Sequence, residues 1–235
     1  MNKKQVISLV CVFLIGCLLL LAASILKKHR TIIEWDGNPY NIENINPVDA
    51  KFAQPYNRAL DKTGDACIAI TCAMVSLVII INFFSSKDKK AALFPAACDC
   101  FTFLMSGVYA NSMYRILKTL AGRIRPYMYF VNPSAKGVAE GDFYRSWPSG
   151  HSANVFIVFA FLLTWFAVRK ADSKFKKPVL TLSFLFCIVT MALRMLSGNH
   201  FLTDVLSGAT LGFIVSYIIS NLCYSIIGGK NDNRN

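Results

Sequence analysis

The sequence lacks the glycine-rich loops with which proteins bind nucleotides. It contains no Walker loop and no dinucleotide-binding fingerprint, so nothing in it supports nucleotide-driven chemistry. Its eight cysteines all lie in or at the edge of apolar runs, which argues against a disulfide framework. Cys98 and Cys100 have no matching second pair, so we expect no zinc site. No metal and no cofactor is indicated.

Acidic residues are scarce. The 13 Asp and Glu residues stand against 25 Lys and Arg, which gives a formal net charge of +12. In a soluble protein this excess would suggest nucleic acid as the partner. Here much of the positive charge lies in short loops between apolar runs, so anionic lipid headgroups and an anionic substrate explain it better. We therefore expect membrane lipids as partners and no nucleic acid.

Hydrophobic residues make up 54% of the chain and cluster in six runs. Runs of about 20 apolar residues can cross the hydrocarbon core of a bilayer as helices. Continuous runs without alternation favour helices over strands, and only helices or closed barrels can span lipid. The sequence thus predicts an all-α bundle in a single membrane domain, residues 1–235, with transmembrane helices at about residues 6–26, 66–84, 91–117, 153–168, 179–196 and 201–227.

The first run also has features of a secretory signal peptide. It follows Lys3-Lys4, and residues 14–17 (Leu-Ile-Gly-Cys) resemble a lipoprotein cleavage site. However, the run continues about nine residues beyond Cys17, whereas the apolar core of a signal peptide spans about 7–15 residues. We therefore expect the run to be retained as a helix. Cleavage would leave the rest of the topology unchanged.

The loops predict an orientation. The N-terminus, residues 87–90, residues 169–177 and the C-terminal tail together carry 12 Lys or Arg and three acidic residues. The opposite loops, 27–65, 118–152 and the turn near His200, are longer and hold most of the acidic residues. Because short loops dense in Lys and Arg stay in the cytoplasm, both termini are expected there. The active-site side, which includes His200, then faces the periplasm or the cell exterior.

Two smaller features carry structural expectations. The acidic, Asn-rich stretch from Glu34 to Asp65 is predicted to be an external loop. Asp99 lies inside the third run, where a charged group usually has a partner, so we expect it to pair with another helix.

Three polar segments lie on the predicted outer side: Lys118 to Pro126, Pro148 to His151, and Arg194 to Asp204. Each segment alone has a plainer interpretation. The basic residues of the first could anchor a helix end near lipid headgroups, the second could be a turn with a helix cap, and the histidine of the third could be a packed side chain. Ionisable groups are costly at a membrane boundary, so their convergence from distant parts of the chain suggests a site.

These segments contain the groups that phosphoryl transfer needs. Negative charge spreads over the phosphoryl oxygens, and the fixed cations Lys118, Arg125 and Arg194 would stabilise it. Ser149 and Gly150 lie just before a predicted helix, whose first N–H groups attract anions.

The histidines supply a nucleophile and an acid. His200 and Asp204 are four residues apart and share one face if the last helix includes both. Asp204 would then accept the Nδ1 proton of His200 and leave Nε2 free to attack phosphorus. His151 is available to protonate the leaving oxygen and later to activate water.

The three segments resemble the signature of the type 2 phosphatidic acid phosphatase superfamily. Its pattern is Lys-six residues-Arg-Pro, then Pro-Ser-Gly-His, then Ser-Arg-five residues-His-three residues-Asp. The chain matches the first two in full and has Leu193 where the third begins with serine. The resemblance implies metal-independent catalysis, with His200 as nucleophile, Asp204 as its partner, His151 as general acid, and phosphate binding by Lys118, Arg125, Arg194, Ser149 and Gly150.

The resemblance implies hydrolysis of a lipid phosphate or diphosphate through a phosphohistidine, on the outer face of the cytoplasmic membrane. Candidate substrates are lipid A phosphates, undecaprenyl diphosphate, phosphatidylglycerol phosphate and phosphatidic acid. The small size and outward site resemble those of the bacterial lipid A phosphatases and undecaprenyl diphosphate phosphatases. A phosphotransferase that uses the same intermediate is the first alternative. A six-helix transporter is the second, although neither inverted repeats nor midplane charges are evident.

Overall fold

The computed structural model describes residues 1–30, 33–169 and 173–228. The predicted cytoplasmic loop 169–177 lies partly outside these residues, and the tail from Lys230 onward lies wholly outside them. Within the described part of the chain, all regular elements are helical, and six helices are long and apolar enough to cross a membrane. These findings confirm the predicted fold class. The six helices are α1 (Lys3–Lys28), α3 (Arg58–Ser85), α4 (Lys89–Ala121), α6 (Gly150–Arg169), α7 (Ser173–Leu196) and α8 (Leu202–Ile227).

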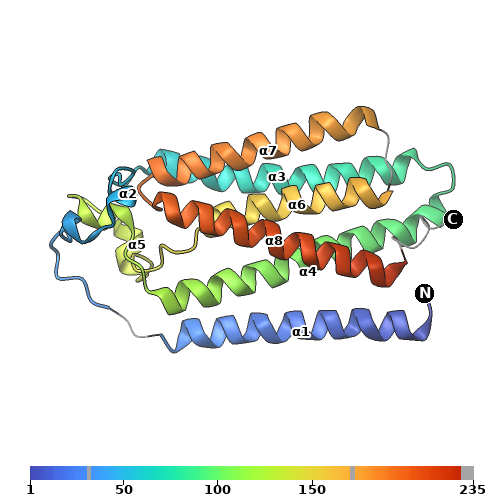
Figure 1. Cartoon of the computed structure of the whole chain (residues 1–235), viewed down its shortest axis with the longest axis horizontal. Helices are drawn as coiled ribbons and strands as arrows, with labels where there is room; N and C mark the ends of the chain where they lie inside the picture. Colours follow the sequence, from blue (N-terminus) through green and yellow to red (C-terminus); the bar gives the residue numbers. More distant parts are fainter. Residues whose placement is uncertain (31–32, 170–172, 229–235) are drawn as a thin grey trace.

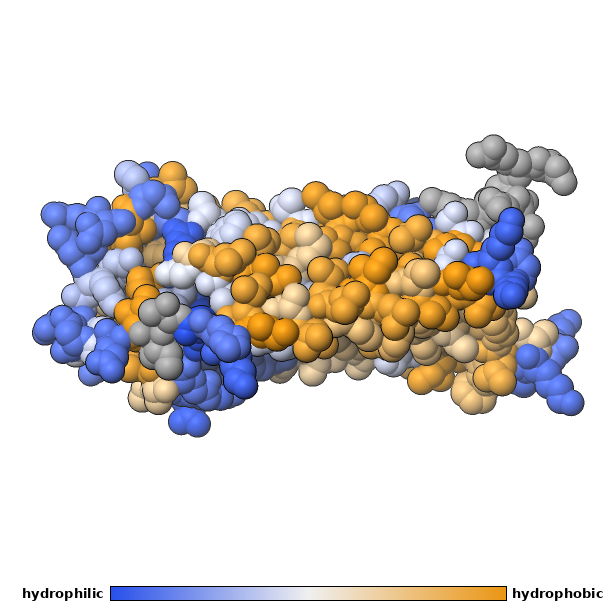
Figure 2. Space-filling view, turned by 90° about the horizontal axis from the view of Figure 1, so that it is seen from below, coloured by the Kyte–Doolittle hydropathy of each residue, from blue (hydrophilic) through white to orange (hydrophobic). Residues whose placement is uncertain are grey.

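The long helices run side by side, and the short elements gather at one end of the bundle (Figure 1). These elements are η1 (Ile42–Asn44), α2 (Pro47–Ala50), η2 (Pro126–Tyr129) and α5 (Ala135–Ala139). The N-terminus and the last turn of α8 lie at the opposite end. A broad hydrophobic belt covers the middle of the bundle, between two hydrophilic ends (Figure 2). This is the surface that a bilayer would cover.

Helix α3 is longer than the sequence analysis predicts. It begins at Arg58 rather than near residue 66. The last residues of the expected external loop therefore form the first two turns of α3. The side chain of Asn57 accepts a hydrogen bond from the N–H of Leu60 and caps the helix. The charged residues Asp61 and Asp65 lie in these turns, and their low hydropathy conceals the helix from a search for apolar runs.

Helix α6 is the central helix, and most of its side chains are buried. It packs closely against α8 because Gly208 and Gly212 have no side chains. A Cβ atom at Gly208 would lie 2.2 Å from the carbonyl oxygen of Ser149, and one at Gly212 would lie 2.2 Å from that of Ala153. Small residues four positions apart allow such close helix contact in membranes. The contact fixes the start of α6 against the start of α8.

Gly208→Ala is expected to lower both stability and activity. The new methyl group must displace the backbone at Ser149, which costs about 1–3 kcal/mol. It also moves the start of α6, and a displacement of about 1 Å at a reacting group can reduce turnover about 100-fold. Thermal melting and phosphate release in detergent would measure the two effects. Gly107→Ala is the matched control, because nothing lies within 4 Å of a Cβ atom there. An active, wild-type-like Gly208→Ala protein would contradict this role for the contact.

Asp99 pairs with other helices, as expected. Its buried carboxylate accepts hydrogen bonds from Arg169 Nη2 at 2.6 Å, Trp165 Nε1 at 2.9 Å and the Tyr224 hydroxyl at 2.8 Å. These partners lie on α6 and α8, so the cluster joins three helices near the end of the bundle that holds the N-terminus. A fully hydrogen-bonded buried carboxylate of this kind stabilises the arrangement of the helices.

Candidate active site

The predicted site residues all lie at the end of the bundle that holds the short elements. Three of them belong to helix ends: Lys118 lies in the last turn of α4, Arg194 in the last turn of α7, and His151 in the first turn of α6. Arg125 follows α4, and His200 lies between α7 and α8. The structure therefore brings together groups that are far apart in the chain, such as His151 and Asp65, which are 86 positions apart, and Arg194 and Asp61, which are 133 positions apart.

A polar cavity of about 660 Å³ opens at this end. Arg125, Arg194 and His151 line it, together with Asn199. His200 is 1% exposed and does not line the cavity, although the positive charges of Lys118, Arg125 and Arg194 all act on it. The arrangement is a polar cavity lined by both basic and acidic side chains, and the charges of three basic residues act on a buried histidine that does not line it.

Arg125 is held in place by three groups. Its Nη1 donates to the amide oxygen of Asn199 at 2.7 Å, its Nε donates to the carbonyl oxygen of Asp142 at 3.0 Å, and its Nη2 pairs with the Asp142 carboxylate. Burial opposes the ionisation of Asp142, but the charges of Arg125, Lys118 and Arg145 lower the pKa of this carboxyl below its usual value. Asp142 is therefore ionised at neutral pH and anchors Arg125.

Arg194 is buried and is anchored by α3. Its Nη1 pairs with Asp61, whose carboxylate also accepts hydrogen bonds from the Tyr56 hydroxyl at 2.9 Å and from the Asn199 amide at 3.1 Å. Gly64 makes room for it, since a Cβ atom there would lie 3.2 Å from Arg194 Cδ. Within the described residues, Arg194 Nε is buried without a hydrogen-bond partner. Arg194 also lines the cavity, and a buried donor without a partner is suited to an anionic ligand.

The expected hydrogen bond between His200 and Asp204 does not form as predicted. His200 Nδ1 lies 3.7 Å from Asp204 Oδ2, which is within ion-pair range but beyond hydrogen-bond range. The reason is that α8 begins at Leu202, so only Asp204 belongs to the helix. Its carboxylate instead accepts from the N–H of Phe201 at 2.9 Å and from the Ser146 hydroxyl. His200 Nδ1 is buried and has no hydrogen-bond partner in the described part of the chain.

Arg123 joins Asp204 to α2. Its Nη1 donates to Asp204 at 2.6 Å, and its Nη2 pairs with Asp49, a fully buried residue of α2. Asp49 also accepts from the hydroxyl of Thr203 at 2.6 Å. Burial opposes its ionisation, but these hydrogen bonds lower the pKa of Asp49. In the sequence, Arg123 lies in the first polar segment between the two basic motif residues, Lys118 and Arg125. No separate role is predicted for it.

Arg123→Gln is expected to reduce stability and turnover together. It leaves the buried carboxylates of Asp49 and Asp204 without their cation, and breaking a buried pair in this way costs about 3–5 kcal/mol. We expect a lower melting temperature and at least about a tenfold loss of phosphate release, because Asp204 borders His200. Lys90→Gln is the control, since Lys90 is exposed in the first turn of α4, at the end of the bundle opposite the candidate site. A normal melting temperature for Arg123→Gln would show that the network contributes little.

Burial lowers the pKa of His200 well below its usual value of about 6.5. The positive charges of Lys118, Arg125 and Arg194 lower it further. His200 is therefore neutral at physiological pH and has a free electron pair on one ring nitrogen. A neutral imidazole has the free electron pair that a nucleophile needs, and neighbouring cations favour an anionic group.

Ser149 and Gly150 lie at the start of α6, as predicted. The Ser149 hydroxyl is buried and contacts the Ser152 hydroxyl at 3.1 Å. The backbone N–H of Ser149 donates to the carbonyl oxygen of Asp204 at 2.9 Å. A Cβ atom at Gly150 would lie 2.9 Å from the Tyr114 ring of α4. In this structure the two residues mainly pack the start of α6 against α8 and α4.

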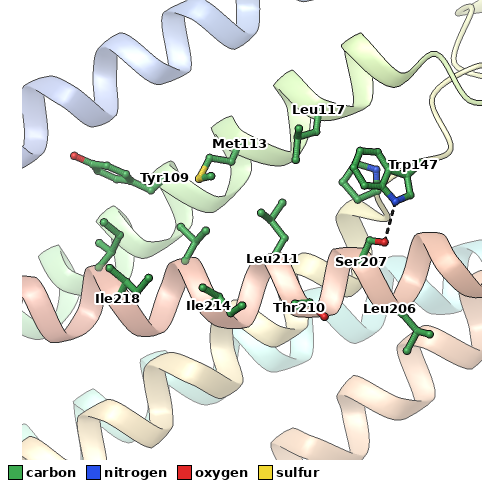
Figure 3. A pocket seen from close by; sticks show the side chains of 13 residues that line it. Tyr109, Met113, Leu117, Trp147, Leu206, Ser207, Thr210, Leu211, Ile214 and Ile218 are labelled. Carbon is green, nitrogen blue, oxygen red and sulfur yellow. Dashed lines mark hydrogen bonds between the residues drawn. The ribbon is translucent and has the colours of Figure 1, made fainter.

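An apolar groove of about 720 Å³ lies between α4 and α8 and shares no lining residue with the polar cavity. Its outer end is formed by Trp147, whose indole N–H donates to the Ser207 hydroxyl at 2.8 Å (Figure 3). Leu211 of α8 points toward α4, from which Met113 extends into the groove. The lining suits hydrocarbon rather than phosphate.

The profile of the PAP2 superfamily matches residues 96–227. The chain belongs to the PAP2 superfamily. The matched region of this PAP2 protein contains all three polar segments, from Lys118 to Asp204, but it excludes α3. The carboxylates of Asp61 and Asp65 thus lie outside the matched region.

One PAP2 relative is phosphatidylglycerophosphatase B from Bacillus subtilis (strain 168). It is 33% identical over 182 residues, which cover 75% of this chain and 80% of that protein. A crystal structure of a transmembrane PAP2-type phosphatidylglycerolphosphate phosphatase from Bacillus subtilis also aligns with this chain. The alignment covers 93% of this chain and 96% of that chain, with 21% identity and a TM-score of 0.47.

Proposed function

We propose that this PAP2 protein is a lipid phosphatase that transfers the phosphoryl group of its substrate to His200 and then to water. The observation that carries the proposal is the arrangement of Arg125, Arg194 and His151 around one polar cavity, beside the buried neutral imidazole of His200. Such a cavity binds a phosphate dianion and places a nucleophile next to it.

The first step forms a phosphohistidine. Nε2 of His200 bonds to phosphorus while the bond from phosphorus to the ester oxygen breaks, and His151 gives a proton to that oxygen. Nδ1 of His200 lies on the side of Asp204, so this carboxylate stabilises the positive charge that develops on the ring. In the second step, His151 takes a proton from water, the hydroxide bonds to phosphorus, and the bond from phosphorus to nitrogen breaks.

The cations replace the positive charge that a metal supplies in other phosphatases. Lys118, Arg125 and Arg194 are all buried, and fixed charges in a water-poor site stabilise a transition state strongly. We therefore propose that hydrolysis needs no metal ion.

The site faces away from the cytoplasm in this proposal. The candidate site and the N-terminus lie at opposite ends of the bundle (Figure 1). The density of Lys and Arg in the short loops at the end that holds the N-terminus assigns that end to the cytoplasm. The substrate is then a lipid of the outer leaflet of the cytoplasmic membrane.

Phosphatidylglycerol phosphate is the first candidate substrate, because the relative with 33% identity is named as a phosphatidylglycerophosphatase. A cavity of about 660 Å³ accommodates a glycerol phosphate headgroup, while the acyl chains remain beside the apolar belt.

The test is phosphate release by purified protein in detergent, in the presence of EDTA. The panel contains phosphatidylglycerol phosphate, phosphatidic acid, undecaprenyl diphosphate and a lipid A phosphate. We expect release that survives EDTA and is fastest with phosphatidylglycerol phosphate. Release that stops with EDTA and returns with a divalent cation would refute the metal-free step. Absence of release from every lipid, with or without an acceptor alcohol, would refute the phosphatase assignment.

A further inference from the structure

The first two turns of α3 place a carboxylate directly beside His151. Asp65 Oδ1 lies 2.8 Å from His151 Nε2, which is hydrogen-bond distance. Both residues line the polar cavity. The other oxygen of Asp65 pairs at 3.0 Å with Nζ of Lys62, a largely exposed residue that also lines the cavity. The contact joins α3 to α6, and α3 lies outside the region that the superfamily profile matches.

Asp65 is the carboxylate partner of His151, and the other charged groups that act on this ring most strongly are positive. Arg194 on α7 and Lys118 on α4 both act on it electrostatically. Positive neighbours disfavour a proton on an imidazole, whereas a hydrogen-bonded carboxylate favours it. A general acid must carry a proton when the substrate binds, so Asp65 supplies the interaction that the acid role requires.

The hydrogen bond also distinguishes the two ring nitrogens. Because Nε2 is occupied by Asp65, Nδ1 is the nitrogen left to exchange a proton with the substrate. A carboxylate that holds one ring N–H fixes the orientation of the ring and stabilises its charged form.

We infer that Asp65 is a positioning residue that holds the protonated ring of His151 for proton transfer to the leaving oxygen; the inference rests on the proposed function. In the first step the leaving oxygen takes the proton from Nδ1, and the ring becomes neutral while Nε2–H stays bonded to Asp65. In the second step water returns a proton to Nδ1 as its hydroxide bonds to phosphorus. Protons balance over the cycle, and no other reactant is needed.

The inference predicts an effect that depends on the leaving group. An alkoxide leaving group needs its proton, whereas p-nitrophenolate departs readily without one. The ratio kcat/KM reports on the steps up to the first irreversible one, which is phosphohistidine formation. We expect Asp65→Ala to lower kcat/KM about 10- to 100-fold for the preferred lipid phosphate and less than about threefold for p-nitrophenyl phosphate.

The effects on KM and kcat should also differ. Asp65 adds a negative charge to a cavity that binds an anion, so its removal is not expected to weaken substrate binding. For the lipid phosphate, kcat should fall while KM stays the same or decreases. General damage to the cavity would raise KM for both substrates.

Two further variants complete the design. Asp65→Glu keeps the carboxylate and should restore most of the lipid activity. Lys62→Gln removes the other partner of Asp65 and should leave the ratio between the two substrates unchanged. Equal losses for both substrates in Asp65→Ala, or no loss for either, would overturn the inference. Activity of His200→Ala, measured in parallel, would instead refute the proposed function, so the two failures are distinguishable.

Discussion

His200→Ala is expected to abolish phosphate release, with a loss of about 10⁴-fold or more in kcat. The reason is that His200 is the proposed acceptor of the phosphoryl group, and the proposed reaction assigns that role to no other residue. Because the imidazole is buried, we expect the variant to be somewhat less stable, so its melting temperature must be measured beside its activity.

His29→Ala is the matched control for this experiment. The chain has three histidines, and His29 is the exposed residue that follows α1. Its removal should leave both activity and melting temperature unchanged. A folded His200→Ala protein that retains more than about one-hundredth of wild-type turnover would show that another group accepts the phosphoryl group.

Arg194→Ala is expected to lower kcat/KM about 100- to 1,000-fold, which is the usual effect of removing a donor that stabilises developing negative charge. Arg194 is 2% exposed, and its buried Nε has no partner in the described residues, so it is available to a phosphoryl oxygen. Arg194→Lys keeps the charge but loses the planar fork, and it should recover only part of the activity.

Arg115→Ala provides the comparison for Arg194. Arg115 also lies near the end of a transmembrane helix, but its side chain is exposed. Its loss should change kcat/KM less than about twofold. Equal effects of the two substitutions would indicate that overall positive charge, rather than a fixed contact with phosphate, explains the role of Arg194.

The six transmembrane helices could be predicted from the sequence because hydrophobic runs of sufficient length have few alternatives in a bilayer. The motif residues could be identified as a group because their types and spacing are specific. Their convergence at one end of the bundle also follows from helix order, since each segment adjoins the same end of a transmembrane helix.

The anchors of the cationic groups could not be predicted in the same way. Asp61 and Asp65 lie on α3, more than 80 positions from the residues they contact on α6 and α7. They also lower the hydropathy of the first two turns of α3, which makes those turns resemble a loop. Only the packing of α3 against α6 and α7 brings these carboxylates to Arg194 and His151.

The relation between His200 and Asp204 illustrates a different limit. Their spacing of four residues suggests a shared helix face, but the helix begins between them. Asp204 uses its carboxylate to cap α8 and to bind Arg123, which sequence spacing does not reveal. Asn199 could have been noticed because it precedes His200 directly, but its bridging position between Arg125 and Asp61 requires the folded chain.

The most direct test of the central claim is to trap the phosphohistidine. In His151→Ala, p-nitrophenyl phosphate can still phosphorylate the nucleophile because its leaving group needs no acid, whereas hydrolysis of the intermediate lacks its base. We predict that radiolabelled substrate leaves an acid-labile, alkali-stable phosphate on the peptide that contains His200, and that no label appears in the His151→Ala, His200→Ala double variant. Label on another residue, or product formation in a single turnover without any label, would contradict the account.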